Sequence, residues 1–156
     1  MNLQRIASWV LALAFAAALV FMVGLPKLIG PNPNPIFALI EGRSGIAVFD
    51  PELRRLTGIG ELLAAVLLIV PYTRFYGAAL AGVITISAIG FHLSPWLGVR
   101  LPEMTGLNAA LQEGRSVAEI DAMGLPNDGG ALFYTALVFL AFSAALLWLE
   151  RGRLRR

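Results

Sequence analysis

Residues 56–71 read Leu-Thr-Gly-Ile-Gly-Glu-Leu-Leu-Ala-Ala-Val-Leu-Leu-Ile-Val-Pro, an apolar helical stretch interrupted by one carboxylate, Glu61. An ionisable side chain that faces hydrocarbon costs between about 2.5 and more than 10 kcal/mol, so such residues usually point into a helix bundle and meet a partner. We therefore expect another apolar segment to supply that partner. Lys27 and His92 are the two candidates, because each lies toward one end of such a segment.

The composition indicates an integral membrane protein. The 156 residues are 58% hydrophobic and 14% charged, with a mean hydropathy of +0.75, well beyond the values of a soluble domain. One membrane domain, residues 1–156, accounts for the length, since four spans of about 20 residues leave room only for modest loops. The chain has no cysteine, so any redox chemistry would need a bound cofactor or a partner protein.

The sequence predicts an all-α membrane protein, a four-transmembrane-helix bundle with a long, partly helical outer loop between helices 3 and 4. The predicted spans cover about residues 6–28, 51–71, 75–94 and 129–149. The first apolar run is longer than the roughly 7 to 15 residues of a signal-peptide core, so we interpret it as a retained span.

Local residues indicate where the second and third spans begin and end. Asp50 and Pro51 are typical of the N-cap and first position of a helix, and Pro71 ends it. The turn at residues 72–74 is very short, so the second and third spans are expected to be antiparallel neighbours. His92 closes the third span.

Two connections lie outside the predicted spans. Residues 31–49 begin with alternating prolines, which favour an extended run, and we interpret them as loop with at most one short interfacial helix. In the outer loop, residues 106–114 and 116–124 each end at a glycine and are expected to form short helices. Ser116 and Glu119 predict a capping box at the start of the second.

The arginines predict the orientation. One side of the membrane holds arginines in very short segments, namely Arg5, Arg74, Arg151, Arg153, Arg155 and Arg156, while the other side dilutes its arginines through longer acidic loops. The positive-inside rule then places both termini of this multi-pass protein in the cytoplasm. The same rule explains the basic tail without a nucleic-acid partner.

With that topology, Lys27, Glu61 and His92 lie in the outer half of the membrane and form the candidate site. Gly58, one turn before the carboxylate, would let a ligand or a neighbouring backbone come close. Tyr134 and other aromatic residues fall at the same face and either line a pocket or form an interfacial belt. We treat these five residues as candidates for ligand binding or proton relay.

Each candidate also has a structural interpretation. Lys27 can extend its ammonium to the interface, and His92 can cap its own helix end or pack against the loop. Glu61 can belong to a purely structural ion pair. A single histidine cannot build the multi-histidine metal sites of membrane oxidases, and no P-loop or nucleophile elbow is present, so no metal site or catalytic residue is assigned.

Three short motifs carry a resemblance to a known family. Gly24-Leu25-Pro26-Lys27-Leu28 closes the first span, Thr57-Gly58-Ile59-Gly60-Glu61-Leu62 lies in the second, and His92-Leu93 ends the third. In their order and spacing these resemble the DoxX-like family of small four-span bacterial membrane proteins. The loop at residues 94–130 is an elaboration on that pattern.

The resemblance implies association with membrane redox systems, such as subunits similar to those of thiosulfate-quinone oxidoreductases. Two functions are therefore expected as alternatives. The first is an accessory subunit, rather than a stand-alone enzyme, that binds a quinone or another lipophilic molecule for a redox partner. The second is a membrane scaffold or a small proton-coupled transporter. Assembly with further copies of the chain stays open under both.

Overall fold

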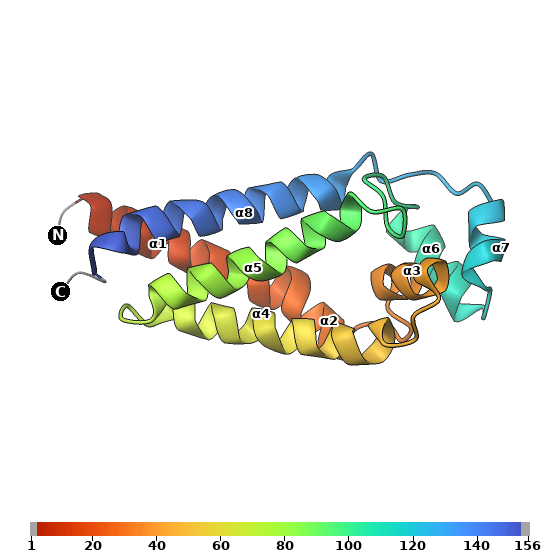
Figure 1. The fold of residues 1–156 in the computed structure, drawn as a ribbon, viewed down its shortest axis with the longest axis horizontal. Helices are drawn as coiled ribbons and strands as arrows, with labels where there is room; N and C mark the ends of the chain where they lie inside the picture. The colour runs from red at the N-terminus through yellow and green to blue at the C-terminus, as the bar shows by residue number, and fades with distance from the viewer. Residues whose placement is uncertain (1–2, 154–156) are drawn as a thin grey trace.

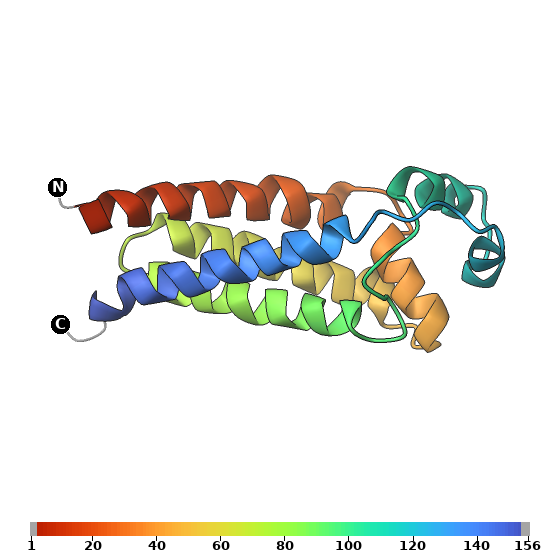
Figure 2. The same cartoon turned by 90° about the horizontal axis from the view of Figure 1, so that it is seen from above.

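The structure is a computed structural model that describes residues 3–153. Long helices run side by side along one axis, and short helices cover one end of the bundle (Figure 1). The first helix begins and the last long helix ends at the opposite end (Figure 1). We call the end covered by the short helices the cap end, and the opposite end the terminal end. Figure 2 shows the same separation of bundle and cap from a perpendicular direction.

The first long segment consists of α1 (Leu3–Ala18), a π-helical turn η1 (Leu19–Gly24) and α2 (Leu25–Ile29). Pro26 has no N–H to donate to the carbonyl four residues before it, which favours an irregular turn at this point. A Cβ on Gly24 would lie 2.8 Å from the Leu19 carbonyl oxygen and 2.9 Å from Leu62 Cδ2. Glycine is therefore required where this turn packs against the second long helix.

The second and third long helices, α4 (Arg54–Ile69) and α5 (Arg74–His92), form the expected antiparallel pair. Their backbones approach closely at Gly77, where a Cβ would lie 2.7 Å from the Leu68 nitrogen and 2.9 Å from the Ala64 oxygen. Small residues at such a contact let membrane helices pack tightly.

The fourth long helix, α8 (Ala131–Glu150), packs against α5 and α1. Phe15 of α1 contacts Phe139 and Phe142 of α8 edge to face, with ring centroids 5.4 Å and 5.6 Å apart. The bundle core combines these rings with small and aliphatic residues. Its buried members are Ala12, Phe15, Ala16, Leu19, Ala64, Ala65, Leu68, Ala78, Ala81, Phe139 and Leu146.

Among the described residues, three helical segments are long and apolar enough to cross a membrane, which indicates a membrane protein. They are Leu3–Ile29, Arg74–His92 and Ala131–Glu150. The predicted second span corresponds to α4, whose 16 residues extend over about 24 Å. α4 is therefore shorter than the other three segments, although it packs among them.

The cap consists of α3 (Pro35–Ser44), the π-helical turn η2 (Phe49–Leu53), α6 (Met104–Gln112) and α7 (Val117–Ala122). It has its own apolar core. The buried members are Leu39, Ile40, Phe49, Leu97, Leu101, Leu107, Ala110, Leu111 and Ile120. α7 lies within the expected helical stretch 116–124, whereas α6 begins and ends two residues before the expected stretch 106–114. The predicted capping box of Ser116 and Glu119 is present.

α3 is the one short helix that the sequence interpretation allowed for in this connection. Asn34 Oδ1 accepts hydrogen bonds from the backbone nitrogens of Ile36 (3.2 Å) and Phe37 (3.4 Å), and Pro35 occupies the first helical position. The helix ends at Gly45, whose φ of 72° is left-handed. The last of the alternating prolines thus starts a ten-residue helix instead of preventing one.

Candidate functional site

Lys27 of α2 and Glu61 of α4 form an ion pair inside the bundle, with Lys27 Nζ donating to Glu61 Oε1. The exposed fractions of the two side chains are 16% and 6%. Glu61 is the eighth residue of α4, which places it about 10 Å from the start of that helix. The carboxylate is thus buried well within the apolar segment, with its partner reaching it from the neighbouring helix.

Gly58 allows this pair to form. A Cβ at this position would lie 3.1 Å from Leu28 Cγ and Cδ2 and 3.1 Å from Lys27 Cβ. The absence of a side chain lets α2 lie close against α4, one turn from Glu61. Gly58 therefore contributes to the candidate site through backbone packing, which is one of the two roles that the sequence suggested for it.

The second carboxylate oxygen of Glu61, Oε2, is buried and has no hydrogen-bond partner among residues 3–153. Such a group is costly unless something else satisfies it. Lys27 Nζ lies 5.9 Å from the centre of the Phe37 ring, so α3 of the cap covers the lysine. An ammonium has three donors, and the pair therefore offers both a donor and an acceptor to a polar group that reaches it.

His92 has partners other than the ion pair. Its Nδ1 lies 2.9 Å from the carbonyl oxygen of Gly98, and its ring packs edge to face against Phe133, with centroids 5.7 Å apart. The buried imidazole therefore holds the turn after α5 against α8. This arrangement matches the structural interpretation of His92, and its membership of the same site as Lys27 and Glu61 stays a prediction.

Tyr134 lies on the outside of the bundle. Its side chain is 61% exposed, and its ring contacts Phe133, with centroids 5.9 Å apart. A ring near the first turn of α8 with one face open is typical of an interfacial aromatic residue. A role of Tyr134 in ligand binding stays a prediction.

A second buried ion pair lies at the start of α4, and sequence reasoning did not identify it. Arg54 Nε lies 2.6 Å from Asp50 Oδ1, and Asp50 Oδ2 accepts from the backbone nitrogen of Asn34 at 2.7 Å. Asp50 has the extended backbone expected before a helix start (φ −127°, ψ 118°), but its carboxylate binds these groups instead of forming the predicted cap. The i, i+4 spacing of Asp50 and Arg54 was the available signal.

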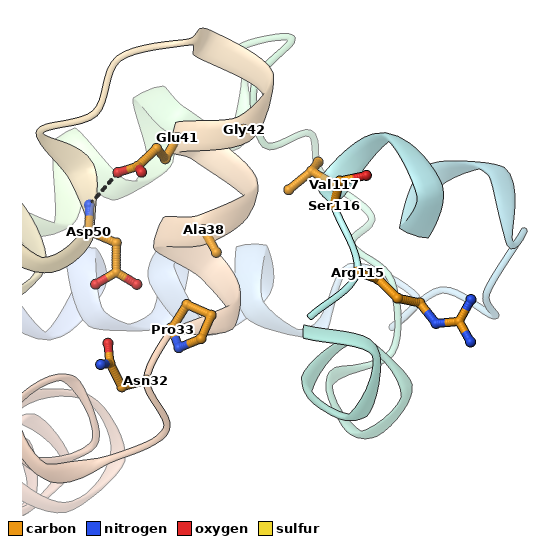
Figure 3. Close-up of a pocket in the computed structure, with 9 residues that line it drawn as sticks. All are labelled: Asn32, Pro33, Ala38, Glu41, Gly42, Asp50, Arg115, Ser116 and Val117. Atoms are coloured by element: carbon orange, nitrogen blue, oxygen red, sulfur yellow. Dashed lines mark hydrogen bonds between the residues drawn. The ribbon is translucent and has the colours of Figure 1, made fainter. Parts of the chain in front are cut away.

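A cleft of about 450 Å³ lies between α3, the segment before it and the start of α7 (Figure 3). Its lining residues are Asn32, Pro33, Ala38, Glu41, Gly42, Asp50, Arg115, Ser116 and Val117. Figure 3 shows the Arg115 side chain directed away from the others. The cleft does not include Lys27, Glu61 or His92, and it is not the pocket that the sequence suggested around them.

The terminal end holds a third buried charged group. Arg74 Nη1 donates to Ser8 Oγ (2.9 Å), Arg74 Nε donates to the Leu68 carbonyl (2.9 Å), and Ser8 donates to Glu150. The guanidinium also stacks over the Trp9 ring at 4.1 Å. The sequence interpretation counted Arg74 among the arginines of a short connection on one side of the membrane, whereas its side chain is fully buried in the bundle.

Comparisons with known proteins do not identify the chain. No family model matches it, and neither any curated protein nor any solved structure is significantly similar to it. Among residues 3–153, no group of three or more metal-ligating side chains is placed to hold a metal ion. The candidate site itself consists of a lysine, a carboxylate and their apolar surroundings.

Proposed function

We propose that this chain is a DoxX-like accessory subunit of a membrane redox system, which binds a quinone-like or other polar-headed lipophile at the Lys27–Glu61 pair. In this proposal it spans the bacterial inner membrane four times, with α4 as the second span. Both termini lie in the cytoplasm and the cap faces outward. The order of the family-like motifs supports the relation to the DoxX-like family, and the distribution of arginines supports the orientation in the membrane.

The observation that carries the proposal is the buried Oε2 of Glu61, which lacks a hydrogen-bond partner in the described chain. A quinol hydroxyl could donate to this oxygen, and a quinone carbonyl could accept from Lys27 Nζ. Exposed apolar residues on the segment that carries Lys27, such as Met22 and Ile29, offer a surface for the ligand's tail. The chain has no cysteine, so a partner subunit would exchange electrons with the ligand.

The test is to purify the wild-type protein, Glu61→Gln and Glu52→Gln side by side and to quantify the quinone that copurifies with each. A water-soluble quinone analogue is then titrated into all three. We expect Glu61→Gln to lose bound quinone and to bind the analogue more weakly, because the amide is a poorer acceptor for the hydroxyl. Glu52 is exposed near the end of η2, so Glu52→Gln should match the wild type. Negligible binding to all three proteins would refute the proposal.

The alternative is a membrane scaffold or a small proton-coupled transporter. Buried ion pairs at both ends of the bundle favour it, because pairs such as Lys27–Glu61 and Arg74–Glu150 can fasten helices together without any ligand. A pH-dependent flux in proteoliposomes that Glu61→Gln abolishes would favour the transporter. The absence of both flux and quinone would favour the scaffold.

A further inference from the structure

The two ends of the molecule differ in charge. Eight of the ten acidic residues lie in the cap and its connections, a ninth is Glu61 inside the bundle, and only Glu150 belongs to the terminal end. Six of the twelve basic residues belong to the segments that start, turn or finish at the terminal end. They are Arg5, Arg74, Arg151, Arg153, Arg155 and Arg156, of which the last two lie outside the described residues. Six arginines and one glutamate leave these segments with a large positive charge.

Ion pairs neutralise arginines on the surface of the cap. Arg43 Nη2 lies 2.6 Å from Asp121 Oδ1, and Arg115 Nε lies 2.9 Å from Glu113 Oε2. At the terminal end the one acidic side chain, Glu150, is 2% exposed and is held inside the bundle. The surface of the terminal end is therefore positively charged, and an anionic partner is complementary to it.

The first turn of α1 and the last turn of α8 meet at this end. Gln4 Nε2 donates to the carbonyl oxygen of Leu149 at 3.0 Å, and Figure 1 shows the two helix ends side by side. Arg5 and Arg151 follow these residues by one and two positions, and both side chains are exposed. Two arginines from neighbouring helices thus lie on one part of the surface, which we call the terminal rim.

Apolar side chains continue from the terminal rim along the outside of the bundle. Ile6, Val10 and Leu13 of α1 are exposed, and their spacing of four and three residues places them on one side of the helix. On α8, the Trp148 ring is 57% exposed and lies 5.0 Å from the guanidinium carbon of Arg151. An exposed tryptophan beside an arginine is typical of the headgroup level of a membrane. The rim therefore suits a ligand with an anionic head and an apolar tail.

We propose that the terminal rim binds anionic phospholipid headgroups through Arg5 and Arg151, with the acyl chains against the exposed apolar residues beside them. A guanidinium presents several N–H donors in a planar fork that matches a phosphate group, and basic clusters next to a membrane span attract anionic lipids. The inference is independent of the proposed function, because neither the Lys27–Glu61 pair nor a quinone takes part. With both termini in the cytoplasm, as proposed, the lipid belongs to the inner leaflet.

The test is native mass spectrometry of the full chain in detergent, titrated with phosphatidylglycerol and phosphatidylcholine that have the same acyl chains. Since the chains are identical, the ratio of the two dissociation constants reports the headgroup. Arg5→Gln/Arg151→Gln removes the two charges of the rim. Arg55→Gln/Arg100→Gln is the matched control, because it removes two exposed arginines from the other half of the molecule.

We expect the wild-type protein to bind phosphatidylglycerol about tenfold or more tightly than phosphatidylcholine, as two arginines near a charged headgroup would give. Arg5→Gln/Arg151→Gln should reduce this ratio to about twofold or less, whereas the control should keep the wild-type ratio. Raising the ammonium acetate concentration should also lower the ratio, because salt screens exposed charges. Inorganic phosphate at the concentration of the lipid should not displace it, since phosphate has no acyl chain.

Three results would overturn the inference. Equal binding of the two lipids to the wild-type protein would show that the headgroup charge is not recognised. A wild-type ratio in Arg5→Gln/Arg151→Gln would place the recognition elsewhere, and Arg151→Gln alone provides the measurement if the double variant does not fold. Displacement by inorganic phosphate would identify a phosphate site instead of a lipid site. All variants keep Glu61, so a failure here is distinct from a failure to bind quinone.

Discussion

Arg74 Nη1, at the first residue of α5, lies 3.5 Å from Glu150 Oε1, at the last residue of α8. Ser8 of α1 hydrogen-bonds to both side chains, and the Leu68 carbonyl of α4 accepts from Arg74. One buried guanidinium therefore contacts all four long segments at the terminal end. The stability of the bundle should depend strongly on it.

Arg74→Ala should lower the free energy of unfolding by about 3–5 kcal/mol, because it leaves Glu150 as a buried charge without this partner. The double variant Arg74→Leu/Glu150→Leu should lose less, since no charge remains buried. Arg151→Ala, an exposed arginine at the same end, should change stability by at most about 1 kcal/mol through its contact with Trp148. Melting in detergent measures all three, and equal losses for the single and double variants would contradict the prediction.

Lys27→Ala should destabilise the protein more than the double variant Lys27→Ala/Glu61→Ala. Removing only the lysine leaves a buried carboxylate uncompensated, at a cost of about 3–5 kcal/mol. Removing both leaves a cavity but no charge. A thermodynamic cycle with Glu61→Ala measures the coupling, and additive effects would show that the pair contributes no interaction energy.

Gly77→Ala should destabilise the α4–α5 pair by about 1–3 kcal/mol, because the added methyl group would overlap backbone atoms of α4. Gly90 is the matched control on the same helix, since a Cβ there would have no neighbour within 4 Å. Gly90→Ala should be neutral or slightly stabilising. Melting temperatures in detergent compare the two, and similar values would mean that the helices separate readily at Gly77.

The proposed topology predicts the labelling of introduced thiols in intact cells. A membrane-impermeant thiol reagent should label Ala47→Cys, which is exposed before η2, and should leave Gly152→Cys unlabelled until the cells are broken. Both positions are exposed, so burial does not explain a difference between them. The reverse pattern would place the termini outside and the cap in the cytoplasm.

The capping box of α7 predicts a pH effect in the cap. Hydrogen bonds from the Ser116 side chain and backbone hold the pKa of Glu119 below its usual value. The carboxylate therefore stabilises α7 fully above the pKa of the unfolded chain, and this contribution is lost as the pH falls through the lower, folded pKa. An NMR titration of Glu119 should show a higher pKa in Ser116→Ala, whereas an unchanged pKa would exclude the side-chain hydrogen bond of Ser116 as a cause.

Some of these features could be predicted because their signals are local. The cost of burying Glu61 required a partner, and Lys27 was one of two candidates for it. The short turn after Pro71 required antiparallel neighbours, and Ser116 with Glu119 formed a recognisable cap. The turn and the cap depend on neighbouring residues, and the partner of Glu61 follows from the large free-energy cost of burying its charge alone.

Other features could not be predicted because their causes are distant in the sequence. Arg74 has the position of an interfacial charge, and only its contact with Glu150, 76 residues away, makes its burial tolerable. His92 similarly binds the carbonyl of a loop whose path depends on the cap. Asn34 and Pro35 did carry a local helix-start signal, but the prolines before them concealed it.

The π turn at Leu19–Gly24 sets the rotational phase of the segment that follows. Such a turn adds one residue relative to a regular helix, and each residue rotates the chain by about 100°. Deleting one residue from this turn would restore the regular winding and carry Lys27 about a quarter of the way around the helix axis, away from Glu61. The pairing of the two charges therefore depends on the number of residues before the lysine as much as on the lysine itself.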